Sequence, residues 1–307
     1  MTDLNSSDIP SVSSVGGKGL NLVRLTRAGM SIPKGFIIEA RHFDEYTNEL
    51  KDLRRGDAEP KELSTILTRK INDIVFQKDF IADIVDSFKK LGSRYVAVRS
   101  SAVSEDGENA SWAGQLSTEL NVQQDDLEQA IKKCWASAYS PRALTYALEN
   151  NCALSDISVA VVIQEMIESD VSGVAFSVHP VTNNIQEMVI EAVYGLGEAI
   201  VSCAVTPDEY VVKKNDLSIV DTTAARQDKK ISLHDGVTDW VPVPAQLSKQ
   251  QKLNTDEITE VASALKLIEQ KMGYPADVEW ALKDRKLYIT QSRPITTLKI
   301  DIMKEGK

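Results

Sequence analysis

Hydrophobic positions in the first half of the chain recur mostly at helical spacing. Leu63, Leu67 and Ile71, followed by Ile84 and Phe88, return every three or four residues, which predicts helices between residues 60 and 91. Further helices are expected over residues 20–28 and 127–138 and from Pro141, where Ser140 would be the N-cap. Short apolar runs between them predict strands at 36–38, 95–98 and 118–122.

The second half has a pattern more typical of strands. Strands are expected at 158–166, 173–178, 187–192 and 209–212. A helix is predicted over 256–271, and the chain closes with a hairpin in which 277–282 pairs with 287–292 across a charged turn. This mixture predicts an α+β (mixed α/β) fold.

Composition excludes several classes of protein. The 307 residues are 42% hydrophobic and 26% charged, which is typical of globular domains. The formal net charge of −10 argues against nucleic-acid binding, which needs surplus Lys and Arg. The amino-terminal residues lack a secretory pattern, and the apolar runs are too short to cross a membrane. Three widely spaced cysteines form neither a disulfide framework nor a zinc pattern, so a cytoplasmic location is expected.

Two cationic positions are candidates for phosphate binding. Lys18 lies in the run Gly16–Gly19 before a predicted helix, where backbone N–H groups and the helix dipole favour anions. Arg99 follows a predicted buried strand, where a guanidinium could bind phosphate through two hydrogen bonds. The alternatives are a flexible glycine turn with a solvated Lys18 and a surface ion pair for Arg99.

The closing hairpin is a candidate metal and phosphate site. If its strands pair about the turn and side chains alternate with a period of two, Asp277 and Glu279 share a face with Gln291 and Arg293. Carboxylate and amide oxygens suit Mg²⁺, and a guanidinium suits phosphate. A solvated polar face on an amphipathic hairpin is the alternative.

A fourth candidate lies at the end of the strand predicted over 158–166. Backbone groups in the run Gln164–Ile167 could bind an adenine edge, with apolar side chains against the ring. Packing of this strand end into the core is the alternative.

The order of the motifs along the chain is more specific than any one of them. In sequence, the blocks cover 16–22, 32–36, 98–102, 105–106, 110–115, 164–166, 172–176, 195–198, 206–210, 277–280 and 291–295. Together they resemble the ATP-binding region of the pyruvate phosphate dikinase and phosphoenolpyruvate synthase family, which includes rifampin phosphotransferases. The resemblance covers roughly residues 12 to 298.

The resemblance implies an ATP-grasp-like fold with nucleotide between two lobes, 1–167 and 168–298, followed by a polar tail, 299–307. It implies Mg²⁺ held by Glu279 and Gln291, and catalytic roles for Lys18, Arg99 and Arg293. Residues 104–111 would form a mobile lid. The implied nucleotide-binding positions are Lys18, Arg99, Gly114, Thr118, Gln164, Glu165, Ile167, Glu279, Gln291 and Arg293.

The resemblance also implies an incomplete enzyme. In the family, ATP gives its β-phosphoryl group to a histidine on a separate domain, leaving AMP and phosphate, and a third domain holds the final acceptor. His42, His179 and His234 lack the Gly-Thr-Ser-His setting of that histidine. We therefore expect an excised domain or, as the Met1 start and short tail favour, a subunit with a phosphohistidine-carrying partner, as in phenylphosphate synthase. The small-molecule acceptor, bound elsewhere, would be a phenolic compound or pyruvate.

Two other functions compete with this one. An autonomous ATP-grasp ligase or kinase would release ADP, and a nucleotide sensor would have no catalysis. The sequence also departs from the family at Cys203, where the family often has glycine. A cysteine is expected to require an ordinary backbone conformation there.

Overall fold

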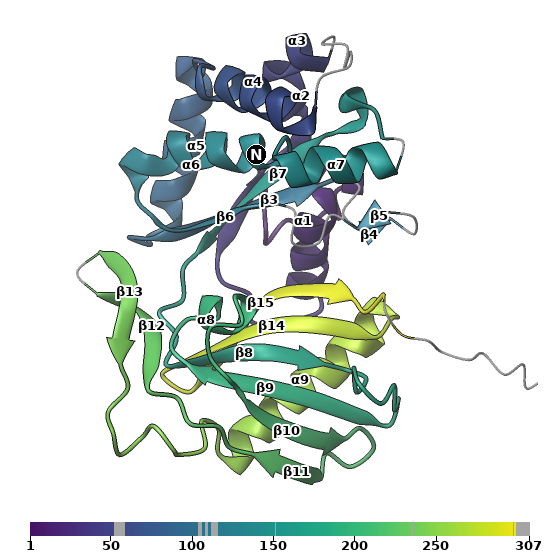
Figure 1. Ribbon diagram of the computed structural model, residues 1–307, viewed down its shortest axis with the longest axis vertical. Coiled ribbons are helices and arrows are strands. Elements are labelled where there is room, and N and C mark those ends of the chain that lie inside the picture. Colours follow the sequence, from purple (N-terminus) through teal and green to yellow (C-terminus); the bar gives the residue numbers. More distant parts are fainter. Residues whose placement is uncertain are drawn as a thin grey trace, which may run out of the picture. The chain divides into compact units, whose positions relative to one another are not determined.

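Two antiparallel sheets, one of five strands and one of six, organise the chain in the computed structural model (Figure 1). The structure describes residues 1–51, 59–103, 106–107, 110–111, 116–150, 152–234, 236–296 and 298. Unit 1 comprises Met1–Arg27 and Pro33–Met166, and unit 2 comprises Ala28–Ile32 and Ile167–Lys307. Antiparallel sheets covered by helices confirm the expected α+β class. Within the described ranges, no helix combines the length and apolar character that a bilayer crossing requires.

Unit 1 contains the five-stranded sheet, in the order β1-β2-β7-β3-β6. Its strands are β1 (Thr2–Asp3), β2 (Gly35–Ile38), β3 (Val96–Ala102), β6 (Thr118–Val122) and β7 (Val159–Glu165), and a separate short pair is formed by β4 (Asp106–Gly107) and β5 (Ala110–Ser111). Its α-helices are α1 (Val12–Arg27), α2 (Ala40–Tyr46), α3 (Asn48–Lys51), α4 (Pro60–Asn72), α5 (Lys78–Leu91), α6 (Leu127–Ser137) and α7 (Pro141–Glu149).

Unit 2 contains the six-stranded sheet, in the order β11-β10-β9-β8-β14-β15. Its strands are β8 (Val171–Phe176), β9 (Glu187–Tyr194), β10 (Asp208–Lys213), β11 (Ile219–Thr223), β14 (Ala276–Lys283) and β15 (Lys286–Pro294), with a separate hairpin of β12 (Lys229–His234) and β13 (Val237–Pro242). Its α-helices are α8 (Glu198–Val201) and α9 (Thr255–Met272).

Most of the predicted elements are confirmed. Ser140 caps α7, because its Oγ accepts a hydrogen bond from the Ala143 N–H at 3.2 Å. The main difference in unit 1 concerns β3, which continues to Ala102 instead of ending at residue 98. Its polar residues Arg99, Ser100 and Ser101 are buried inside the sheet. The change from apolar to polar side chains predicts the end of the strand, but the polar residues lie within it.

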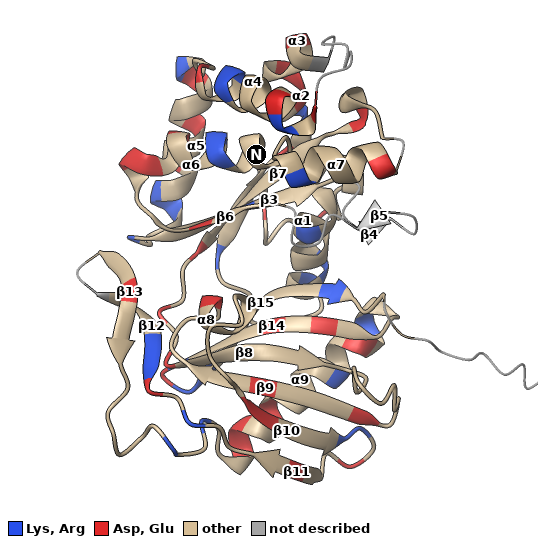
Figure 2. Ribbon diagram, in the orientation of Figure 1, with Lys and Arg blue, Asp and Glu red and all other residues tan. Residues whose placement is uncertain are grey.

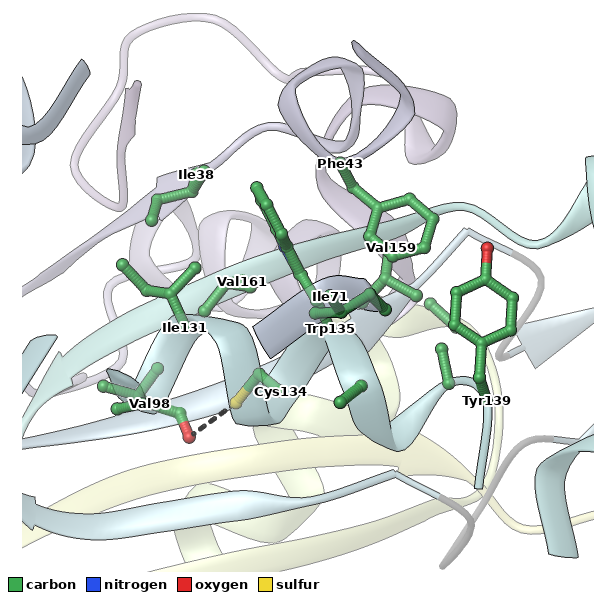
Figure 3. Close-up of a cluster of buried hydrophobic side chains, with 14 of the residues drawn as sticks. Ile38, Phe43, Ile71, Val98, Ile131, Cys134, Trp135, Tyr139, Val159 and Val161 are labelled. Atoms are coloured by element: carbon green, nitrogen blue, oxygen red, sulfur yellow. Dashed lines mark hydrogen bonds between the residues drawn. The ribbon is translucent and has the colours of Figure 1, made fainter. Parts of the chain in front are cut away.

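A hydrophobic core packs against one face of the unit 1 sheet (Figure 3). Trp135 on α6 is fully buried and meets the Phe43 ring edge-on, with ring centroids 5.7 Å apart. Cys134 donates from its Sγ to the Val98 carbonyl on β3 at 3.3 Å. The core thereby fixes β3 from the side of Val98, and alternation directs Arg99 to the opposite face, where α1 lies (Figure 1).

In unit 2, α9 covers one face of the six-stranded sheet (Figure 1). Val278, Trp280 and Leu282 on β14 are buried at 1%, 2% and 4% exposure, as the predicted apolar face of the hairpin requires. The residues between them, including Glu279, therefore project from the other face. Candidate ligands thus lie on the face that α9 leaves uncovered.

Candidate functional site

The glycine-rich run lies inside α1 instead of before it. The helix is interrupted at Gly16, which has φ 70° and ψ 171°, and resumes at once. A Cβ on Gly16 would lie 2.3 Å from the Ser101 carbonyl oxygen on β3. The Ser101 Oγ donates to the Val15 carbonyl and accepts from the Gly19 N–H, at 2.9 and 3.0 Å. The positive φ and this close approach explain why glycine is required, and they bind the start of the second helical segment to β3.

Unit 1 brings both predicted cations to β3. Lys18 Nζ donates to the Ser100 carbonyl at 2.8 Å, and Arg99 Nη1 donates to Gln164 Oε1 at 3.3 Å. Thr118 lies directly opposite Arg99 on β6, so the two share a face. Four predicted site residues therefore come from three adjacent strands and α1.

Gln164 has an unused donor in this cluster. Its side chain is 2% exposed, and its Nε2 has no hydrogen-bond partner among the described residues. An unsatisfied buried amide is costly, so such a group is typical of a site completed by a ligand. The chemistry of this donor set, two cations and an amide, fits a phosphate-bearing nucleotide.

The backbone at the strand end is partly occupied. The Glu165 N–H donates to the Lys34 carbonyl at 2.7 Å, and the Met166 N–H donates to the Tyr95 carbonyl at 3.1 Å. Ile167, half-buried in unit 2, accepts from the Ser169 N–H at 2.9 Å. The N–H groups of Glu165 and Met166 are thus already paired within unit 1, so an adenine edge would have to use other backbone groups of this run.

The closing hairpin of unit 2 has a β-bulge at the candidate metal ligands. Near the turn, Trp280 lies opposite Ile289, but the next pair along the strands is Glu279 with Gln291. Thr290 is therefore an extra residue on β15.

This bulge decides which side chains meet. Under strict alternation from the turn, Glu279 would lie opposite Thr290, and Gln291 would lie opposite Val278 on the apolar face. The shared face of Glu279 and Gln291 is confirmed, but the expected reason, an uninterrupted period of two, was wrong. The two oxygen ligands that suit Mg²⁺ are cross-strand neighbours only because of the bulge.

Arg293 is held by a carboxylate of the same hairpin. Its Nε and Nη2 each lie 2.8 Å from Asp277 Oδ2. Burial raises the pKa of the Asp277 carboxyl, and the guanidinium of Arg293 opposes that shift. Asp277 is thus a residue that sequence reasoning placed on this face without giving it a role. Its position two residues before Glu279 was the available signal, and it fixes the direction in which Arg293 points.

Two further expectations fall on other parts of the chain. Gly114 lies outside the described residues. Of the segment 104–111, expected to be a lid, the structure describes 106–107 and 110–111, which pair as β4 and β5. Of the other candidates, one cluster in unit 1 contains Lys18, Arg99, Thr118 and Gln164, and another in unit 2 contains Glu279, Gln291 and Arg293.

Comparison with known proteins identifies the family. Residues 12–305 match the model of the pyruvate phosphate dikinase AMP/ATP-binding domain. The chain belongs to this family. The match includes all the residues of both clusters, so both lie within the family's domain.

Curated relatives extend well beyond this domain. A probable phosphoenolpyruvate synthase from Archaeoglobus fulgidus is 39% identical, covering 97% of this chain and 41% of the relative. A rifampicin phosphotransferase from Bacillus cereus is 36% identical, covering 92% of this chain and 34% of the relative. The chain thus spans less than half the length of these relatives. A D-alanine–D-alanine ligase structure from Bacillus anthracis covers 91% of this chain and 55% of its own, at 9% identity and a TM-score of 0.37, a similarity that does not establish a shared fold.

Cys203 adopts the conformation that was expected to exclude it. Its φ is 54°, in the left-handed region, so the expectation of an ordinary backbone there was wrong. The side chain is exposed, and the Cys203 N–H still donates to the Ile200 carbonyl at 2.9 Å. The loop therefore keeps a shape suited to glycine, at the expense of strain in a residue with a Cβ.

We expect Cys203→Gly to stabilise the protein. Relief of the left-handed strain, less the greater freedom of glycine in the unfolded chain, should raise the free energy of unfolding by about 0.5–1 kcal/mol. Urea denaturation would measure it, with Cys203→Ala as the control that removes the thiol and keeps the strain. Equal stability of the glycine and alanine variants would contradict this account.

Proposed function

We propose that this chain binds Mg-ATP and supplies a phosphoryl group to a histidine carried by a partner protein or another domain. The β-phosphoryl group passes to the histidine nitrogen as its bond to the α-phosphate breaks and AMP leaves, and water takes the γ-phosphoryl group as phosphate. The phosphohistidine then phosphorylates a small molecule bound elsewhere. Family membership carries this proposal, supported by the two clusters of cations and oxygen ligands.

The residues of the two clusters would have different roles in nucleotide binding. Lys18, Arg99 and Arg293 would neutralise phosphate charge, which is the main requirement of phosphoryl transfer. Gln164 would donate a hydrogen bond from its Nε2, the atom of its amide without a partner among the described residues, to the nucleotide.

The metal has a fitting donor set in unit 2. Glu279 and Gln291 would hold Mg²⁺, since a carboxylate and an amide carbonyl are the hard oxygen ligands that this ion prefers. A bound Mg²⁺ supplies positive charge against the phosphate oxygens. Asp277 fixes the orientation of the Arg293 guanidinium, because Nε and Nη2 of Arg293 both contact the same carboxylate oxygen of Asp277.

The acceptors follow from the relatives only as candidates. The names phosphoenolpyruvate synthase and rifampicin phosphotransferase indicate that acceptors differ among relatives of this chain. Pyruvate or a phenolic compound is the acceptor class that we propose. We place its binding outside this chain, together with the histidine.

Nucleotide products provide the test. Mg-ATP would be incubated with this chain, with and without a candidate histidine-bearing protein, and the nucleotides separated by chromatography. AMP and phosphate that form only when the histidine protein is present support the proposal. ADP released by this chain alone would instead indicate a ligase or simple kinase.

A further inference from the structure

Glu191 lies in the same row across the unit 2 sheet as the two candidate metal ligands. Glu279 pairs with Gln291 on β15 and, on its other side, with Val174 on β8. Val174 in turn pairs with Glu191 on β9. Directly paired residues project from one face of a sheet, so Glu191 and Glu279 point to the same side with only β8 between them.

The spacing sets what Glu191 can do. Two strand separations place the backbones of Glu191 and Glu279 about 9.5 Å apart. The intervening side chain, that of half-buried Val174, is short. The described residues contain no group of three or more His, Cys, Asp or Glu that could hold a metal ion directly. Glu191 is therefore placed to contact the water shell of an ion at Glu279, because protein-bound Mg²⁺ usually keeps several waters.

A negative charge at Glu191 does not stabilise the sheet. Glu191 is half-buried, and its direct partner on β10 is Glu209, another carboxylate. Like charges opposite each other destabilise a pair of strands. Burial raises the pKa of the Glu191 carboxyl, and the carboxylates of Glu209 and Asp277 raise it further. Figure 2 shows the acidic bands on β14, β9 and β10. A locally unfavourable residue beside candidate ligands is typical of a functional position.

We propose that Glu191 is a positioning residue for hydrated Mg²⁺, accepting hydrogen bonds from waters that remain on the ion at Glu279 and Gln291. The inference rests on the proposed function, which places the metal at those two residues. Glu191 would thereby orient the ion without being one of its direct ligands.

Two variants separate this role from a structural one. Glu191→Gln and Glu209→Gln each remove one acid of the same repelling pair, so each should raise the melting temperature of the nucleotide-free protein by about 1–3 °C. Only Glu191→Gln should weaken binding of Mn²⁺, a paramagnetic substitute for Mg²⁺, in the presence of a non-hydrolysable ATP analogue. The expected loss, measured by electron paramagnetic resonance, is about 10-fold, as for other groups that hold metal ligands or waters.

The outcomes distinguish failure of the role proposed for Glu191 from failure of the proposed function on which it rests. Unchanged Mn²⁺ affinity in Glu191→Gln, or an equal loss in Glu209→Gln, would overturn the positioning role. A lowered melting temperature in Glu191→Gln would instead show a structural residue. Glu279→Gln is measured alongside: if it too leaves Mn²⁺ affinity unchanged, the proposed metal site fails, whereas a loss there with none in Glu191→Gln removes only the further inference.

Discussion

Glu279→Ala should strongly reduce Mg-dependent formation of AMP while leaving the fold intact. Glu279 is half-buried on the uncovered face of β14, and its partner there is Gln291 rather than the hydrophobic core. Removing it takes away the only carboxylate of the proposed metal pair. Loss of one preorganised electrostatic group of this kind lowers turnover by about 10²–10³-fold. Chromatography of the nucleotides, with the histidine-bearing protein present, measures this loss.

A second carboxylate on the same face is the matched control. Glu187 lies on β9, four residues before Glu191 and therefore on the same face of the sheet. It pairs with Lys213 at the first residue of the strand, away from Glu279. Glu187→Ala removes equal charge from this sheet, and we expect turnover close to that of the unchanged protein. Circular dichroism and thermal unfolding of both variants would show that the fold is kept. Normal turnover in Glu279→Ala would contradict the assignment of Glu279 as a ligand of Mg²⁺.

Regular periodicity made most of the fold predictable from the sequence. The apolar face of Val278, Trp280 and Leu282 follows from alternation, and its burial against α9 is observed. The expected shared face of Glu279 and Gln291 is also observed, but it depends on a bulge at Thr290. A bulge depends on local twist and on neighbouring strands, which a single sequence does not encode as a pattern.

Other features that the sequence did not predict have a different physical cause. Arg99 was placed beyond a strand because buried strands are usually apolar, yet it is 8% exposed within β3 and reaches Gln164. The hairpin of β12 and β13 was not predicted, because apolar residues such as Val237 and Trp240 are exposed and stand three positions apart, which gives neither strict alternation nor a core pattern. Polar groups placed by tertiary contacts are invisible to periodicity.

The structural role of Asp208 could not be predicted from the sequence and is seen only in the structure. It belongs to the run 206–210 that resembles the family, and it is fully buried. Its Oδ1 accepts from Lys252 Nζ at 2.6 Å and from the Ala225 N–H at 2.8 Å. Its Oδ2 accepts from the Tyr210 hydroxyl and the Lys252 N–H, both at 2.8 Å. Burial raises the pKa of the Tyr210 phenol, so this hydroxyl stays protonated and donates. One carboxylate thereby joins the start of β10 to the segments before β12 and α9.

We expect Asp208→Ala to lower the free energy of unfolding by about 3–5 kcal/mol, the usual effect of removing one member of a buried ion pair. The variant leaves the Lys252 ammonium, fully buried, with the Ala225 carbonyl and the face of the Tyr194 ring as its contacts. Urea denaturation measures the change. Lys252→Met should destabilise less, because the Asp208 carboxylate keeps three uncharged donors.

The double variant Asp208→Ala/Lys252→Met completes the cycle. It leaves no unpaired buried charge, so it should be more stable than Asp208→Ala alone, although one more interaction has been removed. If the two changes simply added, the loss would come from packing and hydrogen bonds, and the ion pair would not be what holds the three segments together. A positive coupling would show that this family motif stabilises the domain through charge, far from the β14–β15 hairpin in the sheet order and independently of nucleotide.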